Sequence, residues 1–131
     1  MKINIAVIPA AGKNSRLLDL PLTKILPKTM LPILNKPILH YIIDQLKSEG
    51  IKQIFIIVNN KKEIIRDYFG DGEEYGVKIS YIYQKKLTGI ADAIKLSNQY
   101  INKPFFTILG DTFISESPFK KMSRVLLQMH N

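Results

Sequence analysis

Four short apolar segments, separated by segments of helical periodicity, constrain what this chain can fold into more than any other feature. They lie at residues 3–8, 54–58, 77–83 and 105–109. The first, second and fourth are almost wholly apolar, as in strands that are buried on both faces. The third alternates between apolar and polar side chains, as in a strand with one face more exposed. We therefore predict four β-strands.

Between and after these segments, apolar residues recur every three or four positions, which predicts amphipathic helices. The first helix is expected to begin at Pro37, with Asn35 upstream as its N-cap. A short second helix is expected to be capped by Asn60. A third covers residues 89–100, and a last helix opens at Ser117.

This alternation predicts an α/β fold: a three-layer αβα, Rossmann-like domain with a mostly parallel sheet and right-handed crossovers. We assign residues 1–131 to a single domain, because a chain of this length can bury one core. In such sheets, ligands bind beyond the carboxyl ends of the strands. The features that follow strand ends here are residues 10–12, Gln84 and Asp111.

The segment from residue 7 to residue 37 is the main functional candidate. Repeated prolines exclude a long helix, and its many leucines and isoleucines are too apolar for a flexible linker. A long loop with apolar anchors inside a compact domain is usually functional. Gly12 lets the backbone approach a ligand closely, while Arg16 and Lys28 supply positive charge. Together they predict an anion site for a polyphosphate.

Composition excludes several classes of function. The chain has no cysteine, which removes disulfides, thiolate metal sites and cysteine nucleophiles and favours a cytoplasmic protein. No apolar run approaches ~18 residues, so we expect no membrane span, and we expect the N-terminal segment to be a core strand rather than a signal peptide.

The net charge is +8, but the lysines occur singly or in pairs and no aromatic residues are interleaved with them. We therefore expect solvated lysines rather than a nucleic-acid surface. The same positive field would attract a nucleoside triphosphate.

The proline-rich segment also carries short motifs in a fixed order. They are Ala11-Gly12, Ser15-Arg16, Pro21-Leu22-Thr23-Lys24, Pro27-Lys28, Met30-Leu31-Pro32 and Lys36-Pro37. This order resembles the signature loop of the sugar-phosphate nucleotidylyltransferases. One departure is Asn14, which stands where that family has a second glycine. Asn is the non-glycine residue that best tolerates positive φ, so the loop geometry is compatible with it.

The resemblance implies a nucleotidyltransferase that joins an NTP, with UTP or dTTP favoured, to a sugar 1-phosphate and releases pyrophosphate. It implies catalytic roles for Arg16 and Lys28 on the phosphates, and a Mg²⁺ ligand role for Asp111. It also implies that Gln84 and Gly89 contact the base. The implied nucleotide-binding set is Ala10, Ala11, Gly12, Ser15, Arg16, Lys28, Gln84 and Gly89. The family's strand order, 3-2-1-4, would set the first and fourth strands side by side.

The resemblance covers only the family's nucleotide-binding half, so the chain looks truncated, and its activity alone is left open. Two alternatives stand beside the enzyme: a non-catalytic or fragmentary nucleotide-binding module that lacks the acceptor site, and a cytidylyltransferase for a non-sugar phosphate. A missing later half would leave the apolar strand at residues 105–109 on a sheet edge. From that edge we expect self-association into a homo-oligomer.

Overall fold

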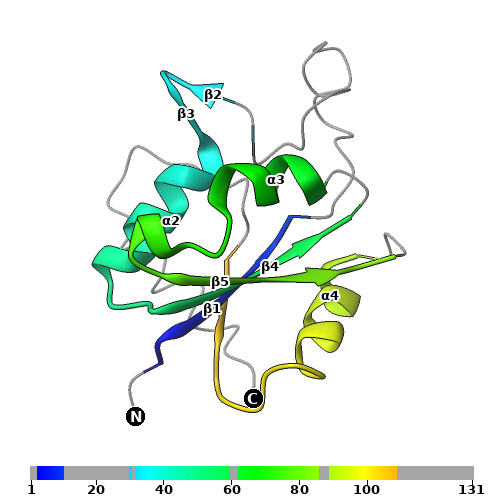
Figure 1. Cartoon of the computed structure of the whole chain (residues 1–131). Coiled ribbons are helices and arrows are strands. Elements are labelled where there is room, and N and C mark those ends of the chain that lie inside the picture. The colour runs from blue at the N-terminus through cyan, green and yellow to red at the C-terminus, as the bar shows by residue number, and fades with distance from the viewer. Residues whose placement is uncertain (1–2, 11–29, 31, 60–61, 86–88, 109–131) are drawn as a thin grey trace.

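The computed structural model describes residues 3–10, 30, 32–59, 62–85 and 89–108. Figure 1 draws these residues in colour. None of the helices in this part of the chain is long and apolar enough to cross a membrane.

A four-stranded parallel sheet forms the centre of the molecule, in the order β5-β4-β1-β6. Its strands are β1 (Ile5–Pro9), β4 (Gln53–Val58), β5 (Lys78–Tyr83) and β6 (Phe106–Thr107). Because these are the first, second, third and fourth of the predicted strands, the expected order 3-2-1-4 is confirmed.

Helices cover both faces of the sheet (Figure 1). On one face lie α2 (Ile38–Ser48) and α3 (Lys62–Phe69), and on the other lies α4 (Ile90–Ser97). A short 3₁₀ helix, η3 (Glu73–Tyr75), precedes β5. The predicted three-layer αβα architecture is therefore confirmed.

The strands alternate their side chains between two separate cores, one on each face. Ile54 and Ile56 of β4 pack in the core that contains the apolar residues of α2, whereas Ile57 packs in the core that contains Ala93 of α4. Both cores are dry: Ile54, Ile56 and Ile57 are fully buried. Parallel strands covered on both faces must be apolar on both faces, which explains the continuous apolar runs in the sequence.

The start of the first helix differs from the prediction. β2 (Pro32–Ile33) and β3 (Lys36–Pro37) pair as an antiparallel hairpin, with Leu34 at a φ of 60° in its turn. Pro37 is the extended N-cap of α2 rather than its first helical residue, and Asn35 lies in the turn rather than at the cap. The pairing of Lys36 and Pro37 in β3 keeps both residues extended, so the helix begins one residue later.

Two other elements are shorter than predicted. α4 ends at Ser97, where the Ser97 hydroxyl donates to the Ala93 carbonyl and the next residues form turns. β6 contains only Phe106 and Thr107, although the Ile108 amide extends its pairing with β1 through a 2.9 Å hydrogen bond to the Val7 carbonyl. The expected cap at Asn60 and the helix after Ser117 lie outside the described residues.

Two glycines flank the turn between α3 and η3 and provide a matched test of its packing. Gly70 and Gly72 both have positive φ, at 56° and 85°. A Cβ at Gly70 would meet no atom within 4 Å, whereas a Cβ at Gly72 would lie 2.6 Å from the Val77 carbonyl oxygen. Only Gly72 is therefore required for close approach as well as for backbone conformation.

We expect Gly70→Ala to lower the free energy of unfolding by about 1 kcal/mol, the cost of a left-handed alanine. Gly72→Ala should cost about 1–3 kcal/mol more, because the carbonyl of Val77 must also move. Urea denaturation of both variants measures the difference. Equal losses would show that the Gly72 contact adds nothing beyond its φ.

Candidate functional site

The carboxyl ends of the parallel strands β1, β4 and β5 lie side by side, at the end of the sheet that we call the carboxyl edge. The Ala10 amide donates to the Ile57 carbonyl at 2.8 Å, and the Gln84 amide donates to the Val58 carbonyl at 2.9 Å. Both bonds continue the parallel ladders one residue past the strands. The residues that follow these strands therefore start from the same edge, where α/β sheets bind ligands.

Gln84 is the most enclosed of the predicted site residues in this part of the chain. It is 8% exposed. Its backbone carbonyl accepts a hydrogen bond from the side-chain amide of Asn59. Since a carbonyl oxygen only accepts, the Asn59 nitrogen must face it. This bond joins the residue after β4 to the residue after β5 and holds the backbone of Gln84 in place.

Sequence analysis did not single out Asn59. The signal was available, because Asn59 directly follows the apolar run of β4, as Gln84 follows β5. Polar residues immediately after buried strands belong to the ligand edge of such a sheet. The partner of Asn59, however, is 25 residues away in sequence, so the bond itself could not be predicted from local pattern.

Gly89 is the N-cap of α4 and has a φ of 108° and a ψ of 176°. Among the described residues, no atom lies within 4 Å of the position that a Cβ would occupy, so the backbone conformation and not crowding favours glycine here. The Gly89 carbonyl accepts from the Ala93 amide at 3.2 Å, which begins the helix. The open space at Gly89 leaves room for a ligand near the first turn of α4.

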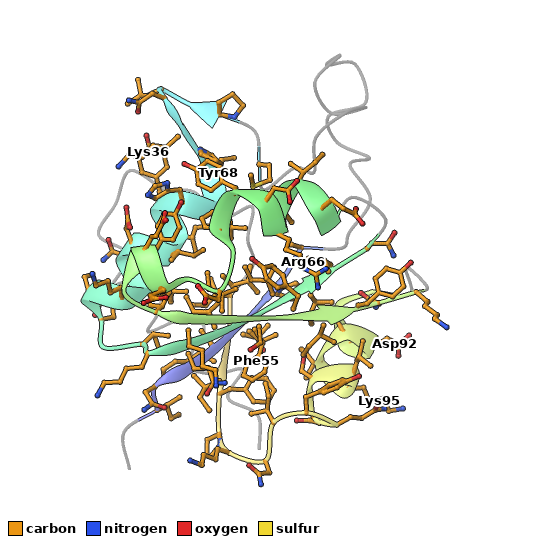
Figure 2. The ribbon with its side chains drawn as sticks, in the orientation of Figure 1. Lys36, Phe55, Arg66, Tyr68, Asp92 and Lys95 are labelled. Atoms are coloured by element: carbon orange, nitrogen blue, oxygen red, sulfur yellow. The ribbon has the colours of Figure 1, made fainter. Side chains whose placement is uncertain are left out.

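Arg66 on α3 is a positive group that was not among the residues predicted from the sequence. Its guanidinium, labelled in Figure 2, lies 5.4 Å from the centre of the Tyr81 ring on β5. The Tyr81 hydroxyl donates to the Gly70 carbonyl at 2.8 Å, and burial raises the pKa of Tyr81 to about 12. The phenol therefore stays protonated at neutral pH and remains a donor. These contacts fix α3 on β5 three residues before Gln84.

Six of the predicted site residues lie outside the described residues: Ala11, Gly12, Ser15, Arg16, Lys28 and Asp111. Of the signature motifs, Met30 is buried in the core under α2, and Lys36 places its ammonium 5.7 Å from the centre of the Tyr41 ring. Met30 thus anchors the end of the proline-rich segment. Lys36 is held against an aromatic face rather than being simply solvated.

The described part of the chain contains no cluster of three His, Cys, Asp or Glu side chains that could hold a metal ion. At the carboxyl edge it offers amide oxygens, from Asn59 and Gln84. A Mg²⁺ ion usually takes only one or two protein carboxylates and completes its coordination with phosphate oxygens and water. Such a site is therefore compatible with a single carboxylate from Asp111, and the metal stays a prediction.

His40 on α2 belongs to a structural cluster away from this edge. Its Nδ1 lies 2.8 Å from the Tyr68 hydroxyl and its Nε2 lies 3.4 Å from Asp44. The ring also makes edge contacts with Phe69 and Tyr75. As expected from its spacing, His40 is an ordinary helix residue, whose partners are aromatic rings and the single carboxylate of Asp44, and it belongs to no cluster of three possible metal ligands among the described residues.

We expect Asn59→Ala to lower the free energy of unfolding by about 1 kcal/mol, because the Gln84 carbonyl loses its donor. Asn59→Asp should cost more at neutral pH, since a carboxylate would face the carbonyl oxygen without a proton to donate. Urea denaturation measures both losses. As a control, Asn102→Ala on the exposed loop before β6 should change stability by less than about 0.5 kcal/mol. An aspartate variant as stable as the native chain would contradict the hydrogen bond.

Comparisons with known proteins agree with this architecture. A model of the nucleotidyl transferase family matches residues 5–129. The UTP–glucose-1-phosphate uridylyltransferase of Mycoplasma pneumoniae is 38% identical over 135 residues, which cover 86% of this chain and 46% of that protein. The UTP–glucose-1-phosphate uridylyltransferase 1 of Staphylococcus saprophyticus is 38% identical over 136 residues, which cover 87% of this chain and 47% of the relative.

Solved structures are similar over the same region. A UDP-glucose pyrophosphorylase complexed with UDP-glucose superposes with a TM-score of 0.77 at 30% identity, over 97% of this chain and 54% of that one. A putative glucose-1-phosphate thymidylyltransferase from Bacillus anthracis gives a TM-score of 0.79 at 31% identity, over 95% and 51%. The chain spans about half the length of these relatives. From its motifs, strand order and matches, the chain belongs to the nucleotidyl transferase family.

Proposed function

We propose that this chain binds a nucleoside triphosphate, UTP or dTTP in preference, and transfers its nucleotidyl group to a sugar 1-phosphate. One observation carries the proposal: the order β5-β4-β1-β6 puts β1 between β4 and β6. The proline-rich segment that follows β1 therefore leaves the sheet next to the residues that follow β4 and next to β6. In the sequence, the basic segment follows β1, Asn59 and Gln84 follow β4 and β5, and Asp111 follows β6.

The proposed reaction needs charge neutralisation more than covalent chemistry. A phosphate oxygen of the sugar 1-phosphate attacks the α-phosphorus of the triphosphate. A new oxygen–phosphorus bond forms, the bond from the α-phosphorus to the bridging oxygen breaks, and pyrophosphate leaves. Negative charge is present on attacker, centre and leaving group together, so positioned cations and backbone donors supply the catalysis. We assign these roles to Arg16, Lys28 and the Gly12 loop.

Base recognition is proposed for Gln84 and Gly89. A glutamine amide offers one acceptor and two donors, which suits the edge of a pyrimidine. The burial of Gln84 and the bond from Asn59 to its carbonyl support this role, since a base reader must be held in place to discriminate. The open space at Gly89 leaves room beside it.

A Mg²⁺ ion is proposed as the cofactor, with Asp111 as its protein ligand. When bound, such an ion neutralises the phosphates and orients the α-phosphorus for attack. Asp111 is three residues beyond Ile108, whose amide pairs with β1.

A second candidate function rests on the share of its relatives that the chain matches. It spans 46% of the Mycoplasma relative and 54% of the pyrophosphorylase structure. A nucleotide-binding module that lacks an acceptor site would fit this coverage, and so would the half of a transferase that binds its nucleotide. A cytidylyltransferase acting on a non-sugar phosphate is a further variant, separated from the others by its preference for CTP.

The nucleotide proposal predicts Mg²⁺-dependent binding of UTP and dTTP with a Kd tighter than ~1 mM, about −4 kcal/mol. Calorimetric titration of UTP, dTTP, CTP, ATP and GTP, with and without Mg²⁺, measures this. Pyrimidines should bind more tightly than purines. If no nucleotide binds at millimolar concentration, the nucleotide site is contradicted. A preference for ATP would contradict the role of Gln84 in base recognition.

Two substitutions separate phosphate binding from base reading. Arg16→Gln should weaken all five nucleotides to a similar degree, because the triphosphate is common to them. Gln84→Leu keeps the side-chain size and should weaken UTP by about five- to tenfold while it leaves ATP unchanged. Lys95→Gln, on the exposed face of α4, is the matched charge control and should change nothing. Equal losses of UTP and ATP in Gln84→Leu would show that Gln84 does not read the base.

Turnover should be far weaker than nucleotide binding. We expect the 131-residue chain to transfer uridylyl or thymidylyl groups to glucose 1-phosphate at well below ~1 per second, because the resemblance implies a sugar pocket in the part of the relatives that this chain does not match. Pyrophosphate release with each pair of substrates measures the rate. A rate of ~1 per second or faster would show that this chain contains a sufficient acceptor site.

A further inference from the structure

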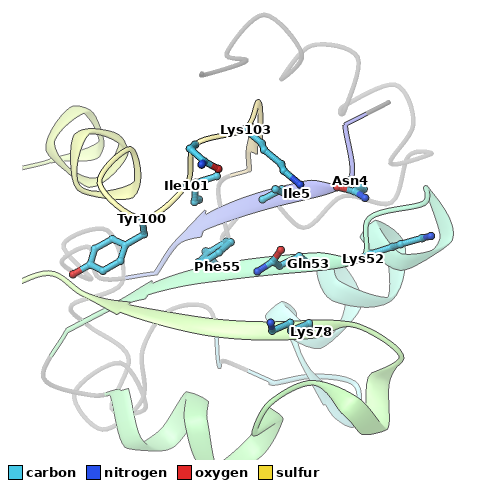
Figure 3. A pocket seen from close by; sticks show the side chains of 10 residues that line it. Asn4, Ile5, Lys52, Gln53, Phe55, Lys78, Tyr100, Ile101 and Lys103 are labelled. Atoms are coloured by element: carbon cyan, nitrogen blue, oxygen red, sulfur yellow. The ribbon is translucent and has the colours of Figure 1, made fainter. Parts of the chain in front are cut away.

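A hollow of about 450 Å³ lies at the amino ends of the strands, at the opposite end of the sheet from the nucleotide edge. Figure 3 shows it between the starts of β1, β4 and β5 and the loop that leads from α4 to β6. Its origin is the early end of α4: the helix stops at Ser97, and the chain then turns through residues 98–100. Among the described residues, α4 therefore does not extend over this part of the sheet face.

The rim of the hollow is basic. Lys52, Lys78 and Lys103 line it, and no aspartate or glutamate is among the ten residues that do so. In Figure 3, Lys103 reaches over β1 toward Asn4, and Lys78 starts from the far side of the hollow, on β5; Lys52 points away. Like charges repel each other, and none of the lining residues offers a carboxylate to offset them, so an anion bound between Lys78 and Lys103 would be stabilised.

The floor and one wall are aromatic. Phe55 on β4 is half-buried and packs against the core under α4. Tyr100 is 64% exposed, an unusual position for a large ring, and it lines the same hollow. Gln53 provides an amide between them and the lysines (Figure 3). A rigid aromatic surface beside a few polar groups is the usual make-up of a small-molecule site.

The floor is also held in place by backbone hydrogen bonds. The Asn4 carbonyl accepts from the amides of Lys52 and Gln53, at 2.9 and 3.2 Å, and the Lys52 carbonyl accepts from Lys78 at 2.9 Å. These bonds tie the starts of β1, β4 and β5 together. A ligand would meet a preorganised surface and would not have to order it.

We propose that this hollow binds a phosphorylated small molecule that contains a ring, with its phosphate between Lys78 and Lys103 and its ring against Phe55 and Tyr100. The volume suits one ligand of ordinary metabolite size. A single nucleic-acid strand would need several stacking rings along a basic groove, and Tyr100 is the one strongly exposed aromatic residue that lines this hollow. The site is separate from the proposed nucleotide site, because the two lie at opposite ends of the same strands.

Titration of the ¹⁵N-labelled chain with 1-naphthyl phosphate, followed by amide chemical shifts, tests the proposal. We expect a Kd of about 1 mM or tighter, with shifts at Gln53, Phe55, Lys78, Tyr100 and Asn102. The doubly substituted chain Lys78→Gln/Lys103→Gln should bind roughly tenfold more weakly, at about threefold for each exposed charge pair. Lys95→Gln removes the same kind of charge outside the hollow and should bind as the native chain does.

A second variant tests the ring. Tyr100→Ala should weaken 1-naphthyl phosphate by several-fold and leave the weaker binding of inorganic phosphate unchanged, because phosphate alone does not touch the aromatic wall. Equal losses for both ligands would contradict the assigned orientation.

Three results would overturn the proposal: shifts confined to Ala10, Asn59 and Gln84 at the carboxyl edge, equal weakening by Lys95→Gln and the double variant, or tighter binding of a twelve-nucleotide single strand to the same amides. The last would identify a nucleic-acid surface. UTP titrated in parallel is followed separately at the amides of Ala10, Asn59 and Gln84 and at those of the hollow, so that binding at each end of the sheet is measured by itself. The nucleotide proposal can therefore fail while this one holds, and the reverse is also true.

Discussion

The structure depends on β1, which pairs with a parallel strand on each side and is buried on both faces. Val7 is level with Phe55 on one side and with Thr107 on the other, and Ala6, Val7 and Ile8 are fully buried. Parallel strands must be connected by crossovers, so helices cover both faces of this sheet. Burial of each Val or Ile side chain contributes about 1.5–3 kcal/mol, so the central strand stabilises the packing of both helical layers.

Parallel pairing also gives the sheet two chemically different ends. At the carboxyl end the chain leaves the strands in loops, and the polar residues Asn59 and Gln84 meet there through one hydrogen bond. At the amino end, Lys52 precedes β4 and Lys78 begins β5, both exposed, and Phe55 and Tyr100 line the hollow beside them. Ligands at the two ends would contact the same strands without competing for the same residues.

The helix α4 is short, and its two ends lie at opposite ends of the sheet. Its first turn begins at Gly89, whose positive φ opens the helix beside the carboxyl edge. Its last turn ends at Ser97, whose side-chain hydroxyl donates a hydrogen bond to the Ala93 carbonyl, and the chain then turns. One helix thus borders the proposed base site and limits the cover over Phe55. The same helix therefore lies beside both ends of the sheet, although the residues at each end differ in chemistry.

Much of the fold follows from the sequence alone. The apolar runs around Val7 and Ile56 predicted buried strands, and the spacing of Leu39, Ile43 and Leu46 predicted one face of a helix. These signals are local, because strand and helix periodicity are repeated within a few residues. The motif order that indicates a polyphosphate loop is local for the same reason.

Only the tertiary structure decided the features that depend on contacts between residues far apart in the sequence. The hairpin that moves the start of α2 past Pro37 requires pairing of β2 with β3, and the bond from Asn59 to Gln84 requires the register of β4 on β5. The basic hollow needs Lys78 and Lys103 from separate elements. No local pattern encodes such distances, because they follow from how strands align after the chain has folded.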